Sequence, residues 1–156
     1  MKSIYKLIIA VVIPLAIGGI SGYFTSSSVN TWFKTLNKPS FNPPSWVFAP
    51  VWTILYILMG ISFYIIWNSH AKLEKRYTGY MYYWLQLALN FCWSFLFFYY
   101  RRPDLALIDI ILLFIMIAST IFSFRKISKL AVWLLVPYLC WVAFATALNF
   151  EIWRLN

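Results

Sequence analysis

Five long apolar stretches, separated by polar connections, constrain this chain more than any other feature of its sequence. They cover approximately residues 4–25, 46–68, 79–100, 103–124 and 129–153. An α-helix rises about 1.5 Å per residue, so about 20 apolar residues span the hydrocarbon core of a bilayer. The stretches lack the alternation of polar and apolar residues that barrel strands show. The sequence therefore predicts an all-α integral membrane protein, a bundle of five transmembrane helices forming a single domain over residues 1–156.

Composition and charge exclude two other classes of protein. The chain is 63% hydrophobic and 11% charged, whereas soluble domains carry about a quarter charged residues, so a water-soluble globule is excluded. Thirteen lysines and arginines against four acids give a net charge of +9, which in a soluble protein would indicate a nucleic-acid partner. Here the basic residues lie between the apolar stretches, where they would meet lipid headgroups. We expect a lipid bilayer as the partner and no nucleic acid.

The basic residues are distributed unevenly between the two ends of the predicted bundle. One end carries the N-terminus and the second and fourth connections, with Lys2, Lys6, Lys72, Lys75, Arg76, Arg125, Lys126 and Lys129. The other end carries Lys34, Lys38, Arg101, Arg102 and Arg154. We expect a bacterial cell membrane, and in such a membrane the positive-inside rule predicts a cytoplasmic N-terminus and places the long loop 26–45 outside.

Aromatic residues make up 22% of the chain, and several repeat at helical spacing. Three helix faces result, formed by Trp52, Tyr56 and Phe63, by Gln86, Asn90, Trp93 and Phe97, and by Pro137, Trp141, Ala145 and Leu148. If these faces converge, they form an aromatic box with the Asn90 amide at its wall, which would suit a planar apolar molecule. The alternatives are a packed bundle core and, for tryptophans near helix ends, an interfacial belt.

Polar residues inside the apolar stretches are few. There is no serine elbow, catalytic carboxylate pair, phosphate-binding glycine loop or metal-ligand cluster, so we expect no metal and no cofactor. Cys92 and Cys140 fall in the middle of apolar stretches and are expected to be buried packing residues. Asp109, inside the fourth stretch, could brace helices or contribute to a ligand site. Glu151 is expected near the membrane surface, beside Arg154.

Two patterns of small residues four apart permit close helix contact. They are Gly18-x-x-x-Gly22 in the first stretch and Ala143-x-x-x-Ala147 in the fifth. Such patterns bring helix backbones together, either within one bundle or between two protomers. A homodimer is therefore one alternative that the sequence leaves open.

Several motifs follow one another along the chain. They read Trp32-Phe33-x-x-Leu36-x-Lys38-Pro39-Ser40-x-x-Pro43-Pro44, Ala49-Pro50-Val51-Trp52-x-x-Leu55-Tyr56-x-x-Met59-Gly60, Gln86-Leu87-Ala88-Leu89-Asn90 with Trp93, and Pro137-Tyr138-Leu139-x-Trp141-x-Ala143-Phe144-Ala145-Thr146-x-Leu148-Asn149. Together they resemble the translocator protein family, also called the tryptophan-rich sensory proteins (TspO/MBR) or peripheral-type benzodiazepine receptors. The resemblance spans the five predicted helices in order.

This resemblance implies a five-helix bundle, often dimeric, with a ligand pocket covered by the first loop. The ligands it implies are porphyrins such as protoporphyrin IX or another tetrapyrrole, and isoquinoline or benzodiazepine drugs. The ligand-binding positions it implies are Pro43, Phe48, Trp52, Asn90, Trp93, Trp141, Ala145 and Leu148. The animal members also bind cholesterol, but Phe150 stands here in place of the tyrosine of their sterol motif, which disfavours cholesterol recognition.

Three functions remain open at this point. The first is a membrane receptor for porphyrins with a tetrapyrrole-regulatory or stress-sensory role, and the second is a tetrapyrrole transporter. The third is a light-dependent porphyrin-degrading enzyme, in which Trp52 and Trp141 would be the catalytic residues that exchange electrons with the porphyrin. Binding ranks first because the aromatic box is visible in the sequence, whereas a translocation path is not.

Overall fold

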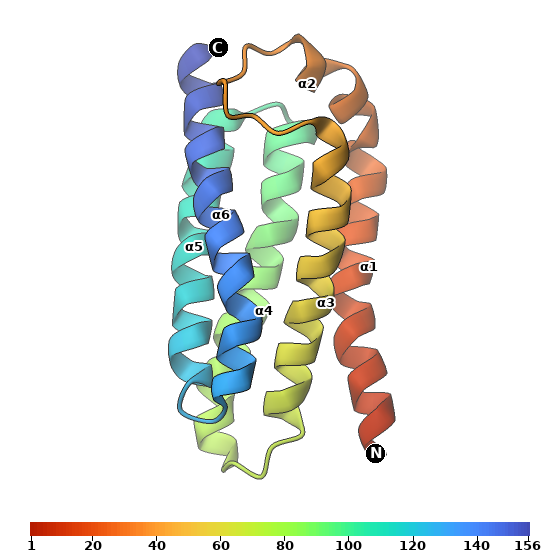
Figure 1. Cartoon of the computed structure of the whole chain (residues 1–156), viewed down its shortest axis with the longest axis vertical. Helices are drawn as coiled ribbons and strands as arrows, with labels where there is room; N and C mark the ends of the chain where they lie inside the picture. Colours follow the sequence, from red (N-terminus) through yellow and green to blue (C-terminus); the bar gives the residue numbers. More distant parts are fainter.

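The computed structural model describes residues 1–156 and contains helices but no strand (Figure 1). Its long helices are α1 (Ser3–Asn30), α3 (Phe48–Trp67), α4 (Leu73–Ser94), α5 (Pro103–Phe124) and α6 (Lys129–Leu155). The first connection contains the short helix α2 (Trp32–Thr35) and a 3-10 turn, Ser45–Val47, and a π-helical turn, Phe95–Tyr99, extends α4. The predicted all-α class is confirmed. The predicted number of helices is not, because α2 makes a sixth α-helix in a segment predicted to be a loop.

Four helical segments are long and apolar enough to cross a membrane. They are α1, the segment Ser45–Trp67 that includes α3, α5 and α6. α4 is not among them, and its sequence explains why. The helix begins with charged residues such as Glu74 and Arg76, and Gln86 and Asn90 interrupt its apolar run. The chain is thus a multi-pass membrane protein, while α4 as a fifth crossing stays a prediction.

Two predicted helix limits differ from the structure. α1 continues through the serine-rich segment to Asn30 instead of ending near residue 25. Hydroxyl groups in this segment bond to the helix itself, as where Thr25 Oγ1 donates to the Ser21 carbonyl at 2.7 Å, so polar residues do not end the helix. α4 begins at Leu73 instead of residue 79, because hydropathy marks only the apolar part of a helix that starts with charged residues.

The later helix starts follow local sequence signals. Pro103 occupies the first turn of α5, where its missing N–H leaves no hydrogen bond unmade. Asp104 in the same turn forms a 2.6 Å ion pair with Arg102. The Oγ atom of Ser128 accepts a hydrogen bond from the Ala131 amide at 3.3 Å and caps the start of α6.

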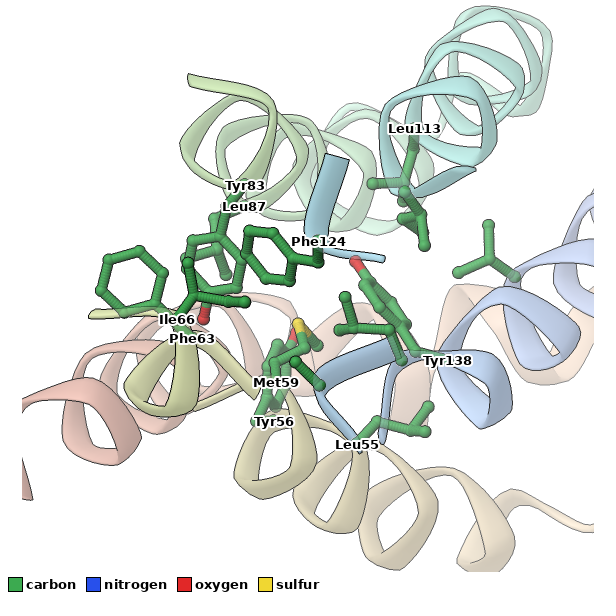
Figure 2. Packing of buried hydrophobic residues seen from close by; sticks show 14 of the residues in the cluster. Leu55, Tyr56, Met59, Phe63, Ile66, Tyr83, Leu87, Leu113, Phe124 and Tyr138 are labelled. Atoms are coloured by element: carbon green, nitrogen blue, oxygen red, sulfur yellow. The ribbon is translucent and has the colours of Figure 1, made fainter. Parts of the chain in front are cut away.

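The long helices form a ring in the order α1, α3, α6, α5, α4, with α1 also touching α4. The backbones of α3 and α4 approach each other at few points, although a short connection joins these helices. Their contact is made by side chains that meet in the centre of the ring, such as Phe63 and Tyr83. At the end of the bundle near the N-terminus, aromatic side chains fill the centre of the ring. Figure 2 shows Phe63 of α3 beside Tyr83 of α4, with ring centroids 4.6 Å apart, and Phe124 of α5 follows at 6.3 Å from Tyr83. This half of the bundle is a packed core.

Two glycines set the distance between α1 and α3. A Cβ atom on Gly60 would lie 2.5 Å from the Ala10 carbonyl oxygen and from the Val11 Cα atom, so only glycine permits this helix contact. A Cβ atom on Gly18 would lie 2.2 Å from the ring of Tyr56. Gly22 has no such neighbour within 4 Å. Gly18 of the small-residue pattern therefore serves packing inside the bundle, whereas Gly22 faces open space.

The expected burial of the two cysteines was wrong. Cys92 and Cys140 are both exposed on the outer surface of the bundle. An apolar stretch contains residues that face the core and residues that face lipid, and both kinds are hydrophobic. The position of a cysteine within such a stretch therefore does not predict its burial.

Replacing Gly60 by alanine should destabilise the bundle, whereas the same change at Gly22 should not. The methyl group in Gly60→Ala meets backbone atoms of α1, so the helices must separate, at a cost of about 1–3 kcal/mol. Gly22→Ala meets open space and gains helix propensity. Apparent thermal unfolding midpoints in detergent test this pair. Equal midpoints for the two variants would contradict the close contact at Gly60.

Candidate functional site

A cavity of about 430 Å³ lies between α1, α3, α4 and α6. It occupies the half of the bundle near α2 and the C-terminus, where the first connection crosses the end of the helices (Figure 1). Phe33 of α2 and Ser45 of the 3-10 turn contribute to its wall from this connection. The volume falls in the range of about 300–1,000 Å³ that is usual for small-molecule sites. The bundle is therefore hollow at one end and packed at the other.

Six aromatic residues form a continuous series around this cavity. Neighbouring ring centroids lie 5.4–6.4 Å apart in the order Trp52, Trp93, Phe97, Phe33, Phe48 and Trp141. The series starts on α3, passes through α4, the π-helical turn and α2, and returns through α3 to α6. Such spacings are those of stacked and edge-to-face aromatic pairs. The cavity thus presents ring faces and edges from five separate parts of the chain.

Most of the predicted ligand-binding residues meet at this one cavity. The residues in its lining are Phe48, Trp52, Trp93, Trp141, Ala145 and Leu148. Pro43 lies in the first connection and Asn90 lies inside the bundle, and neither belongs to the lining. The three helix faces identified in the sequence therefore converge only in part. The residues of these faces that lie outside the lining are Phe63, Gln86, Asn90 and Pro137.

Asn90 is a bridge between helices. Its Oδ1 atom accepts a hydrogen bond from the Tyr56 hydroxyl at 2.7 Å, and its Nδ2 atom donates to the Tyr138 hydroxyl at 2.9 Å. The Tyr138 hydroxyl in turn donates to Gln86 Oε1 at 2.7 Å. Only 2% of the Asn90 surface is exposed. The amide predicted at the wall of the box instead joins α3, α4 and α6 beneath it, where Tyr56 stacks on Trp52 at 5.7 Å.

Trp93 is held in place by a second amide, which the sequence analysis did not identify as a site residue. Its Nε1–H group donates to Asn149 Oδ1 at 3.0 Å, and Asn149 Nδ2 donates to the Pro103 carbonyl at 2.8 Å. Asn149 also belongs to the cavity lining. The signal that could have found it is an amide inside an apolar stretch, directly after Leu148, because such residues need partners in a membrane.

Trp141 differs from Trp93 in its polar contacts. Its Nε1 atom is buried and has no hydrogen-bond acceptor. Its ring packs against Phe48, at a centroid distance of 6.2 Å, and against Phe144 at 5.4 Å. Trp141 therefore contributes ring surface to the cavity, and its N–H group is not used by the protein.

The remaining walls come from parts of the chain that the sequence analysis left out. α1 contributes small residues to the cavity wall, including Gly19 and Gly22. These glycines carry no side chain that could fill the cavity, and no other atom lies close to where a Cβ atom would stand. Exposed polar residues line the outer part of the cavity, namely Ser26, Asn30 and Ser45. The π-helical turn directs Phe97 and Phe98 into the lining. Turns of this kind occur frequently at functional sites.

Other residues considered in the sequence lie away from the cavity. Asp109 is buried on α5, outside the lining, and its Oδ2 atom has no hydrogen-bond partner. The single histidine, His70, lies in the connection between α3 and α4, and the structure contains no cluster of three or more His, Cys, Asp or Glu residues that could hold a metal ion. Glu151 pairs with Arg154 at 2.6 Å, as expected from their positions.

A cavity lined by aromatic residues, in a bundle with four helical segments that can cross a membrane, defines the chain as a helical membrane protein with a site for a small apolar molecule. Residues 10–154 match the TspO/MBR family, and the chain belongs to this family. It is 44% identical to the tryptophan-rich protein TspO of Archaeoglobus fulgidus, over 99% of both chains. It is 42% identical to the human translocator protein, over 80% of this chain and 75% of that protein. The tryptophan-rich sensory protein of Cereibacter sphaeroides is 40% identical, over 80% of this chain and 77% of that protein.

The two tryptophans should respond differently to replacement by phenylalanine. Trp93→Phe leaves the Oδ1 atom of buried Asn149 without a donor, which should cost about 1–3 kcal/mol of stability. Trp141→Phe removes a donor that has no acceptor, so it should cost less. Thermal unfolding of the ligand-free variants measures both effects. A larger loss in Trp141→Phe would show that these hydrogen-bond assignments are wrong.

Proposed function

We propose that this chain is a membrane receptor that binds porphyrins of the protoporphyrin IX type and related apolar ring ligands, with a tetrapyrrole-regulatory or sensory role. The observation that carries the proposal is the continuous aromatic series from Trp52 to Trp141 around one cavity. Membership of the TspO/MBR family and the relatives named translocator protein and tryptophan-rich sensory protein support it. Isoquinoline and benzodiazepine drugs would occupy the same cavity.

The chemistry of a porphyrin fits the two kinds of surface in the cavity. A porphyrin is a flat aromatic ring, and the rings of Trp52 and Trp93, tilted by 33° to each other, offer faces for stacking. Protoporphyrin IX also carries two carboxylates at one edge. The polar residues at the outer part of the cavity, Ser26, Asn30 and Ser45, would keep that edge near water while the ring lies among the aromatic residues.

We also propose that α4 is a fifth membrane crossing and that the N-terminus is cytoplasmic. α4 has 22 residues, or roughly 33 Å at about 1.5 Å per residue, which matches a hydrocarbon core of about 30 Å. It packs along α5, and its polar residues Gln86 and Asn90 are buried inside the bundle.

This topology predicts that the two termini lie on opposite sides of the membrane. A phosphatase reporter active only outside the cytoplasm should be active when fused after Asn156 and inactive when fused before Met1, because positive charge gathers at the end with the N-terminus. Activity from the N-terminal fusion, or from both fusions, would overturn the proposed topology.

A second candidate function is light-dependent degradation of the bound porphyrin, with Trp52 and Trp141 as the reacting residues. The observation that favours it is that both indoles line the same cavity. In this step the excited porphyrin would lose an electron to dioxygen, so that the porphyrin is oxidised and dioxygen is reduced, and an indole stacked on the ring would relay that electron. This function requires the same binding step as the receptor.

Filling the cavity should weaken porphyrin binding. Ala145 lies in the cavity wall, whereas Ala143, on the same helix, is exposed on the outside. In Ala145→Leu the larger side chain competes with the ligand, so we expect about tenfold weaker binding, as an overpacking cost of about 1–3 kcal/mol implies. Ala143→Leu should bind as wild type does. The measurement is saturable quenching of tryptophan fluorescence by protoporphyrin IX in detergent.

Equal affinities in both alanine variants would place the porphyrin outside the cavity and contradict the receptor proposal. Illuminating the same wild-type complex tests the second candidate, because degradation removes the porphyrin absorbance and yields a new product. Loss of this turnover in Trp52→Phe and Trp141→Phe, with binding retained, would support the enzyme. Unchanged turnover in both variants would exclude these residues as the reacting groups.

A further inference from the structure

A second hollow, unconnected with the aromatic cavity, lies at the opposite end of the bundle. It has a volume of about 470 Å³ and lies between the connection from α3 to α4 and the connection from α5 to α6. Ser69, His70 and the three lysines Lys72, Lys75 and Lys126 supply its polar lining. Both connections lie at the end of the bundle where the chain begins (Figure 1). Two segments far apart in sequence thus build one basic hollow.

Close packing brings these segments together. A Cβ atom on Gly79 of α4 would lie 2.9 Å from the ring of Phe124 at the end of α5. This close approach of α4 and α5 places the start of α4, with Lys72 and Lys75, beside the turn that follows α5, with Lys126. The cluster of lysines is therefore fixed by the fold of the bundle.

None of the three lysines has a partner of opposite charge. The two ion pairs of the protein, Arg102 with Asp104 and Arg154 with Glu151, lie at the other end of the bundle. Glu74 in the first turn of α4 is the only acid among the residues at this end, and it makes no ion pair and does not line the hollow. Three lysines without an acidic partner line one concave surface, and positive charges gathered at one place repel each other unless an anion lies among them.

The surroundings of the hollow point to an anion that belongs to a lipid. The Lys126 Nζ atom lies 5.4 Å from the ring centroid of Phe122, and 53% of the Phe122 surface is exposed on the outside of α5. The Arg125 guanidinium lies 4.2 Å from the same ring. Trp133, near the start of α6, is 68% exposed. Exposed aromatic residues next to basic ones are typical of the boundary between headgroups and acyl chains.

We infer that this hollow binds the phosphate headgroup of an anionic phospholipid. The phosphate lies between Lys72, Lys75 and Lys126, and the acyl chains run along the exposed surface of Phe122. Basic pockets between transmembrane helices are known to bind anionic headgroups in this way. The inference does not depend on the ligand of the aromatic cavity, which lies at the other end of the bundle.

The test uses the full chain in an uncharged detergent, titrated with short-chain phosphatidylglycerol and followed by native mass spectrometry. Lys72→Gln/Lys75→Gln/Lys126→Gln should raise the lipid concentration at half occupancy by about a hundredfold, as roughly 1 kcal/mol for each lysine implies. The matched control is Lys2→Gln/Lys6→Gln/Lys129→Gln, which removes equal charge from the same end of the bundle outside the hollow. This control should bind the lipid as wild type does.

Two outcomes would overturn the inference. An equal loss of binding in both triple variants would show that general attraction to positive charge, and not the hollow, holds the lipid. Displacement of the lipid by inorganic phosphate at the same concentration would show a site for free phosphate. Short-chain phosphatidylcholine tests the headgroup charge. It should bind no better to wild type than to Lys72→Gln/Lys75→Gln/Lys126→Gln. Thermal unfolding of both triple variants confirms that each is folded.

Discussion

The hydrogen bonds of Asn90 hold together the part of the bundle on which the cavity rests. Inside a membrane a polar side chain has no water to bond, so its partners must come from the protein. The Asn90 amide takes its partners from Tyr56 of α3 and Tyr138 of α6, and so connects three helices at one level. Tyr56 then supports Trp52 by stacking. The hydrogen-bond network therefore forms the base of the cavity and supports its aromatic lining through Tyr56.

The bundle has a packed core at one end and a cavity at the other. Below the Asn90 network, Gly60 lets α1 and α3 come into backbone contact, and rings such as Phe63 and Tyr83 fill the centre. Above it, the small residues of α1 leave space, and the first connection crosses the end of the bundle. The packed end holds the helices in position, so that the cavity at the other end does not collapse. This arrangement gives a ligand site a rigid base.

The sequence predicted the class of fold and the three tryptophans of the cavity, because both depend on patterns within single helices. Apolar length revealed the spans, and helical spacing placed Trp52, Trp93 and Trp141 on faces that do converge. What it missed depends on contacts between helices. Asn90 turned toward two tyrosines rather than the cavity, and Cys140 faces outward, because hydropathy does not distinguish a face toward lipid from a face toward the core. The π-helical turn at Phe97 has no pattern of its own in the sequence.

If the cavity is the ligand site, a flat aromatic molecule bound there would lie against indoles from separate helices. The most direct measurement is an experimental structure of the protein determined in a bilayer with protoporphyrin IX. The porphyrin should lie between Trp52, Trp93 and Trp141, beneath the first connection. A porphyrin bound on the lipid-facing surface of the helices, with the cavity empty or closed, would contradict it.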